Sequence, residues 1–207
     1  LSELSDLLLL DFSQMFYHRF FKLNYTNRAR WFLLHSLINF VVVYYSLLDL
    51  YTCFTNSSIC YKIPWNYNST KVYYYASVLH IYHCLFFKLT PDDILHHVLM
   101  VALCGTLCYY IQSIISSFAL FFLSGLPGAI DYMLLYLVKM NKIHTLTEKK
   151  VYTYISAYLR APGCVLTLYI GMNGVIDYYN SSEYINLFIL LLTILLIFWN
   201  GQYYLLQ

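Results

Sequence analysis

Residues 92–97 read Asp-Asp-Ile-Leu-His-His, and they open a run from Ile94 to Ile130 that holds no Asp, Glu, Lys or Arg. Such a run is long enough for one membrane-spanning helix of about 20 residues and most of a second. Asp131 follows it directly. Because ionisable groups at membrane depth are costly to keep there, this stretch predicts a polytopic membrane fold with a functional site at His96 and His97.

The composition agrees with a membrane protein. Of the 207 residues, 60% are hydrophobic and only 11% are charged, whereas soluble domains carry about 25% charged residues. The net charge of +2 provides no basic field for nucleic acid. We therefore expect one membrane domain that has lipids, and no nucleic acid, as partners.

The fold class that we predict is an all-α helix bundle of about six transmembrane helices with an amphipathic N-terminal segment. Residues 1–30 form that segment, which is expected to lie on the membrane surface or to make a short first span. Residues 31–207 form the transmembrane domain, and its fifth span is interrupted at Arg160-Ala-Pro-Gly. The predicted spans are residues 31–48, 72–89, 94–111, 118–138, 151–176 and 185–205.

The distribution of Lys and Arg predicts the orientation. Both residue types concentrate in residues 1–30 and in the loop 139–150, and six spans place these on the same side as the 90–93 turn. Basic loops favour the cytosol. The loops 49–70 and 177–183 are nearly free of basic residues and hold three Asn-x-Ser/Thr sequons. The sequence therefore predicts a cytosolic location for the histidine pair.

The compartment follows from the same loops. Cys53 and Cys60 flank a polar loop and can form a local disulfide if that loop is lumenal. A further sequon at Asn24 falls on the predicted cytosolic side and would go unused. We expect the endoplasmic reticulum or another endomembrane. The mitochondrial inner membrane is the alternative, because Tyr-rich membrane subunits occur there.

The residues Thr90-Pro91-Asp92-Asp93 have the pattern of a helix start. Asp92 and His96 are four residues apart, as are Asp93 and His97, so each carboxylate would stack one turn from an imidazole. A carboxylate in that position can fix the tautomer of the imidazole and raise its basicity.

The preceding span contributes two more histidines. His80 and His83 share one face of that span, and a tight turn at residues 90–93 would place His83 at a depth within reach of His97. With Arg160, these two histidines are expected to line a lipid-binding site. Each of them has a simpler interpretation as well, since a hydrogen bond between helices would also satisfy it.

Three interpretations remain open for the whole cluster. The first is general acid–base chemistry on a lipid substrate. The second is a metal site formed by two to four histidines with Asp131 or Asp92. In the third, these residues only cap a helix and face the lipid headgroups. We favour acid–base chemistry with no metal and no cofactor. Seven histidines cannot supply the eight of a di-iron membrane hydroxylase. Asp131 must face the bundle interior, where Arg160 is a candidate partner.

At these residues the chain resembles the TLC-domain family, which includes the ceramide synthases and smaller relatives. The resemblance covers residues 31–205 and rests on the number of spans, on His96-His97 at a helix start, and on Asp131 in the next span. Lys139-Met140 keeps the family's approximate spacing. The His-Asp step and the Glu of ceramide synthases are missing from residues 123–140, so the chain is closer to the small relatives.

The resemblance implies an intramembrane cavity for an acyl chain, with His96 and His97 at its cytosolic mouth. There an acyl-CoA would enter as co-substrate, one histidine would remove a proton from an amine or hydroxyl, and Asp131 would orient that histidine. The alternative function is a non-catalytic membrane subunit that packs against lipids or other membrane proteins in a larger assembly. An elongated cavity would favour the first function, and a solid bundle would favour the second.

Overall fold

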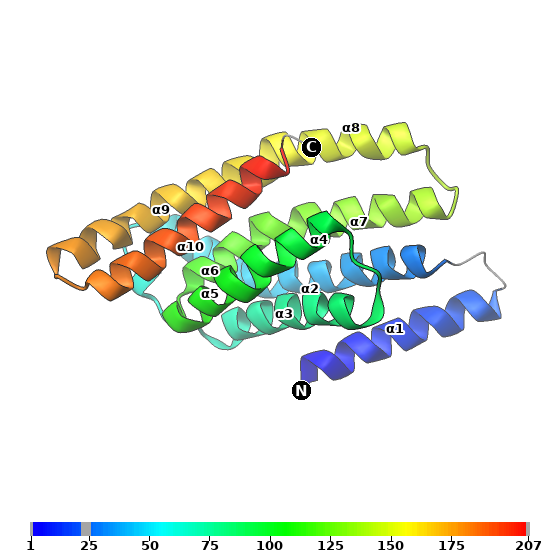
Figure 1. The fold of residues 1–207 in the computed structure, drawn as a ribbon, viewed down its shortest axis with the longest axis horizontal. Helices are drawn as coiled ribbons and strands as arrows, with labels where there is room; N and C mark the ends of the chain where they lie inside the picture. Colours follow the sequence, from blue (N-terminus) through cyan, green and yellow to red (C-terminus); the bar gives the residue numbers. More distant parts are fainter. Residues whose placement is uncertain (1, 22–25, 206–207) are drawn as a thin grey trace.

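The computed structural model describes residues 2–21 and 26–205 (Figure 1), so the sequon at Asn24 lies outside the described residues. Regular structure in the described part is helical apart from one isolated bridge between Pro64 and Ser113. The chain therefore folds as the all-α bundle predicted from its sequence. Its helices are α1 (Ser2–Phe20), α2 (Asn27–Thr55), a 3₁₀ turn (Cys60–Lys62), α3 (Tyr67–Phe86), α4 (Pro91–His96), α5 (Gly105–Ile111), α6 (Ile114–Leu120), α7 (Leu126–Lys139), α8 (Thr145–Ile155), α9 (Ala161–Asn180) and α10 (Tyr184–Tyr203).

Several of these helices join end to end into longer rods. α4 and α5 are continuous through a π-helical segment at His97–Cys104, α6 and α7 through one at Phe121–Gly125, and α8 and α9 through one at Ser156–Arg160. Five helices of the described chain are long and apolar enough to cross a membrane, namely Asn27–Thr55, Pro91–Ile111, Ile114–Lys139, Thr145–Asn180 and Tyr184–Tyr203.

The second predicted span, residues 72–89, corresponds to α3 and does not reach the apolarity of the other five. Its 20 residues extend about 30 Å at 1.5 Å per residue, so its length still matches the hydrocarbon core. Its Tyr, Ser and His side chains lower its hydropathy. Many of them face neighbouring helices, because α3 packs against α2 and α6 inside the bundle.

The connections gather at two ends of the bundle (Figure 1). At one end the loop after α2 meets the α5–α6 turn, where Trp65 N–H donates to the Gln112 carbonyl at 2.7 Å. Lys62 reaches the end of α9 at the same place and pairs with Asp177 at 2.7 Å. The α3–α4 and α7–α8 connections lie toward the opposite end. This grouping agrees with the predicted separation of the loops, while their orientation in a membrane stays a prediction.

The N-terminal helix α1 lies lengthwise beside α2 and α3, not across the end of the bundle (Figure 1). Its polar side faces inward: Asp11 accepts hydrogen bonds from Arg30 of α2 and, at 2.5 Å, from the Tyr82 hydroxyl of α3. Its outer side carries Phe12 and Phe16, which are 64% and 72% exposed. α1 runs along the bundle but is not among the candidate spans of the described chain, so the choice between a surface helix and a short first span stays a prediction.

Two expected boundaries and one expected disulfide differ in the structure. The loop predicted at 139–150 is shorter, because α8 already begins at Thr145, with His144 as its N-cap. The expected interruption at Arg160-Ala-Pro-Gly is a π-helical segment inside a continuous helix. Proline clashes with the carbonyl four residues before it and lacks an N–H, and wider turns directly precede both Pro127 and Pro162. Cys53 and Cys60 are buried free thiols, so the suggested disulfide is not formed.

Close helix contacts depend on small residues. A Cβ at Gly163 of α9 would lie 2.1 Å from the Phe122 ring, so only glycine permits α9 to approach the π-helical segment of the α6–α7 rod. A Cβ at Gly105, by contrast, would meet nothing closer than 3.8 Å. The tight contact at Gly163 helps to fix the positions of the two rods that carry Asp131 and Arg160.

Candidate functional site

Five of the seven histidines gather in the bundle interior. The ring centroids of His80 and His96 are 5.4 Å apart, as are those of His80 and His97. His83 lies 5.2 Å from His97, which confirms that the preceding span brings it within reach of the pair. His35 of α2 joins the group at 5.7 Å from His80.

A backbone carbonyl and a side-chain amide fix two of these rings. His80 Nδ1 lies 2.7 Å from the Ala76 carbonyl, and its Nε2 lies 3.4 Å from His96 Nε2. His96 Nδ1 in turn lies 3.4 Å from the amide nitrogen of Asn200 in α10. These contacts form a chain from α10 to α3 in which each ring has a defined tautomer.

His97 is held differently. Its Nδ1 contacts the main-chain carbonyl of Asp93 one turn earlier, so Nδ1 must carry the proton and Nε2 keeps its lone pair. Nε2 is buried and has no hydrogen-bond partner in the part of the chain that the structure describes. His97 therefore presents a free basic nitrogen to the interior.

The expected pairing of the Asp92 and Asp93 carboxylates with the two histidine rings is wrong, because other groups bind these carboxylates. Thr90 caps the helix as predicted, and the Asp93 carboxylate accepts hydrogen bonds from the Thr90 N–H and hydroxyl, both at 2.7 Å. Asp92 is exposed and accepts a 3.4 Å bond from the Tyr203 hydroxyl. The capping role of the two acids draws their carboxylates away from the rings one turn later.

A polar cavity of about 1030 Å³, part of it open to the outside, surrounds the histidines. Asp131 lines it together with His96 and His97, so the structure brings together the three residues predicted to be catalytic. No hydrogen bond joins Asp131 to a histidine among the described residues, and its Oδ1 has no partner. The charged groups that act on it are Arg160, Glu148 and Lys149.

Arg160 lies at the end of the π-helical segment in the α8–α9 rod and is 7% exposed. Its guanidinium lies over the rings of Tyr152 and Tyr204, at 5.7 and 5.6 Å from their centroids. Burial raises the pKa of Tyr204, just beyond the last span, to about 12, so this residue remains a neutral hydroxyl. The ring contacts hold Arg160 at the polar cavity rather than in an ion pair with Asp131.

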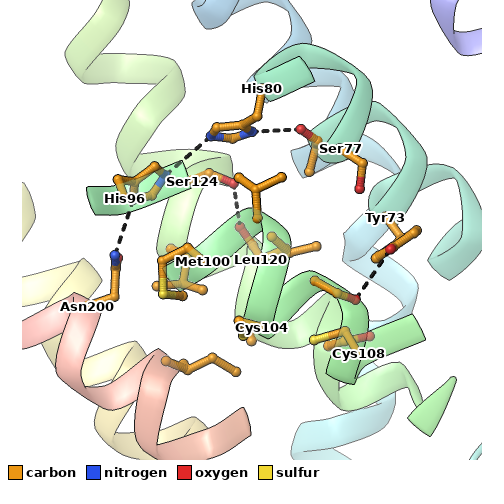
Figure 2. Close-up of a pocket in the computed structure, with 17 residues that line it drawn as sticks. Tyr73, Ser77, His80, His96, Met100, Cys104, Cys108, Leu120, Ser124 and Asn200 are labelled. Carbon is orange, nitrogen blue, oxygen red and sulfur yellow. Dashed lines mark hydrogen bonds between the residues drawn. The ribbon is translucent and has the colours of Figure 1, made fainter. Parts of the chain in front are cut away.

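A second, apolar cavity begins at the same histidines (Figure 2). It contains about 660 Å³ of space, again partly open, and runs between α3, the α4–α5 rod, the α6–α7 rod and α10. From His96 at one end to Cys108 at the other, the α4–α5 rod rises roughly 18 Å at 1.5 Å per residue. The two cavities share five lining residues, His80, His96, Leu123, Ser124 and Asn200.

Four residues of the site were not predicted from the sequence. His35 and Asn39 are four residues apart in the first span and face the cavity from α2, and this spacing was the available signal. Asn200 is a buried amide in the most apolar of the candidate spans, α10, and its position there was a second signal. Glu148 offered no such signal, because its sequence segment is typical of a polar loop.

The other predicted site residues lie at the same place. His80, His83 and Arg160, expected to bind lipid, all line the polar cavity. Within residues 2–21 and 26–205, no group of three or more His, Cys, Asp or Glu side chains is arranged to hold a metal ion.

Comparisons with known proteins give no neighbour. No protein-family model, no curated protein and no solved structure matches the chain. The functional argument therefore rests on the geometry of the two cavities.

Proposed function

We propose that the chain is a lipid-modifying membrane protein of the TLC type that transfers an acyl group from a soluble thioester such as acyl-CoA to an amine or hydroxyl. One observation carries the proposal: an apolar cavity and a polar cavity meet at the histidine cluster. An acyl transferase needs this arrangement, since it must hold a hydrocarbon chain and expose the chain's carbonyl carbon to polar catalytic groups.

The apolar cavity has dimensions suited to an acyl chain. Its depth of roughly 18 Å exceeds the 15 Å or so of one bilayer leaflet, half of the ~30 Å hydrocarbon core. A C–C bond of about 1.5 Å advances an extended chain about 1.3 Å, so the cavity holds roughly 14 carbons. Apolar side chains such as Met100, Cys104, Ala119 and Ile197 line most of it, and the polar side chains of Tyr73 and Ser116 donate to the Gly105 and Ser113 carbonyls.

The chemistry would take place at His97. The nucleophile's nitrogen or oxygen attacks the thioester carbonyl carbon, the C–S bond breaks, and the nucleophile's proton passes to His97 Nε2 and then to the leaving thiolate. The unpartnered Nε2 of His97 supports this assignment as general base. His96, which Asn200 holds through Nδ1, would turn its Nε2–H from His80 Nε2 to the thioester carbonyl oxygen. Asp131 would bind the incoming nucleophile through its free carboxylate oxygen.

The alternative of a non-catalytic membrane subunit requires no interior cavity. A subunit that only packs lipids or partner proteins is expected to have a filled core. The two connected cavities are therefore the reason that we favour acyl transfer over the subunit role.

The test is an acyl-transfer assay on the purified chain in vesicles, with palmitoyl-CoA and a long-chain amine or alcohol, and product detection by mass spectrometry. Replacing both His96 and His97 with Ala is expected to lower turnover about 10²–10⁴-fold, the usual contribution of general acid–base groups. His144→Ala is the matched control, because His144 is exposed and lies outside both cavities. Equal turnover by the wild type and the double variant would remove the catalytic role.

Asp131→Asn separates charge from shape at the third proposed residue. Asn is nearly isosteric and keeps hydrogen-bonding capacity, so a loss of turnover of tenfold or more would show that the carboxylate charge is needed. Unchanged turnover would assign Asp131 a structural role.

A further inference from the structure

Three charged side chains at the polar cavity have an atom with no hydrogen-bond partner within residues 2–21 and 26–205. They are Arg160 through Nε, Asp131 through Oδ1 and Glu148 through Oε2. All three are more than nine-tenths buried, with 7%, 8% and 1% of their surface exposed. Buried charges are normally paired and fully hydrogen-bonded, because an unpaired one is costly.

The site therefore offers both a positive group, Arg160, and two negative groups, Asp131 and Glu148, to a ligand. No ion pair joins Arg160 to Asp131 or Glu148 among the described residues. Lys149 pairs with Glu148 at 3.9 Å, but this contact uses the other carboxylate oxygen, Oε1, and a lysine side chain that is 65% exposed. An anion alone would leave the two acids unpaired, and a cation alone would leave Arg160 unpaired.

The positive side of the site has the character of a phosphate site. The Arg160 guanidinium is held against the rings of Tyr152 and Tyr204, and Arg forms bidentate bonds with phosphate oxygens. Lys149 adds a second cation on a flexible stem at the open side of the same cavity. Two cations match a phosphate group, which offers more charge and more acceptor oxygens than a carboxylate.

We propose that the polar cavity binds a ligand that carries a primary ammonium group and a phosphate group separated by a short linker. The phosphate binds Arg160 and Lys149, and the ammonium donates to the free carboxylate oxygens of Asp131 and Glu148. This chemistry belongs both to a phosphoethanolamine headgroup in a membrane lipid and to free phosphoethanolamine. The assignment of this ligand as acyl acceptor rests on the proposed function, whereas its binding does not.

The experiment measures binding to the full chain in detergent by calorimetry, with O-phosphoethanolamine, ethanolamine and inorganic phosphate as probes. We expect O-phosphoethanolamine to bind at least tenfold more tightly than either half. Arg160→Met and Glu148→Gln are each expected to weaken it about ten- to hundredfold, the effect of losing a hydrogen bond to a charged group. Glu183→Gln, an exposed carboxylate outside the cavity, is the matched control and should change the affinity less than twofold.

A second arm distinguishes the two sources of the ligand. The chain is extracted from vesicles that contain equal parts of phosphatidylethanolamine and phosphatidylcholine, and the retained lipid is identified by native mass spectrometry. The choline headgroup has no N–H to donate, so enrichment of phosphatidylethanolamine identifies the headgroup as the source. Binding of soluble O-phosphoethanolamine without lipid enrichment identifies the free molecule, and both results support the proposal.

Two results would overturn the proposal: no binding of O-phosphoethanolamine, or equal binding of inorganic phosphate alone. Because Glu148→Gln is isosteric, it keeps the test valid if Arg160→Met does not fold. No turnover is needed for this measurement. Binding without acyl transfer would therefore refute only the proposed function, and acyl transfer to a different acceptor without this binding would refute only the present inference.

Discussion

Filling the deep end of the apolar cavity is expected to shorten the acyl chain that the protein accepts. Cys108 lines that end and is 6% exposed, and Cys108→Phe would place a ring across the cavity. Losing one helical turn of depth, about 5.4 Å, removes space for about four methylenes at 1.3 Å each. Each methylene buried from water contributes about 0.8 kcal/mol, so a chain that fills the wild-type cavity would lose up to about 3 kcal/mol of binding.

The assay compares turnover or binding for acyl-CoA chains of 8 to about 18 carbons, a series chosen to bracket the estimated cavity length. About 3 kcal/mol corresponds to roughly a hundredfold loss, and we expect it for long chains, with chains of about ten carbons unaffected. Cys84→Phe, at an exposed cysteine of α3, is the control. The reasoning fails if Cys108→Phe reduces all chain lengths equally while the protein unfolds at its usual temperature.

Two further predictions concern the fold. Gly163→Ala should destabilise the protein by about 1–3 kcal/mol through overpacking, whereas Gly105→Ala should be neutral or slightly stabilising. Thermal unfolding in detergent measures both effects. Equal shifts in the unfolding temperature of the two variants would contradict the contact described at Gly163. Asp11→Ala leaves Arg30 unpaired against α1 and should cost about 3 kcal/mol. Its effect should be faster hydrogen exchange in α1 alone, and unchanged exchange there would show that other contacts hold the helix.

The sequence predicted the positions of the helices well where a long apolar run alone determines them. The uncharged run from Ile94 to Ile130 corresponds to parts of two spanning rods, and the Thr90 cap is where the pattern placed it. The sequence did not predict the π-helical segments, since they arise from packing and from prolines within a continuous helix. Nor did it predict that α1 turns its polar side inward, because that depends on Asp11 meeting Arg30 of α2.

The site was predictable in part for a physical reason. His96, His97 and Asp131 stand out because ionisable residues are rare at membrane depth, and the structure places them in one cavity. Their hydrogen-bond partners could not be predicted, since Asn200 comes from a helix far along the chain. The carboxylates of Asp92 and Asp93 were assigned to the rings because helical spacing alone does not reveal that capping competes for them.

The central claim is that an acyl chain occupies the apolar cavity with its carbonyl end at the histidines. A fatty acyl-CoA with a diazirine near the end of its chain tests this most directly, by photo-crosslinking in vesicles and peptide mapping by mass spectrometry. We predict crosslinks to Cys104, Cys108 and Ala119, which line the cavity, and their loss when unlabelled acyl-CoA competes. Crosslinks confined to outward residues such as Leu85 and Phe188, which are 71% and 63% exposed, would contradict the claim.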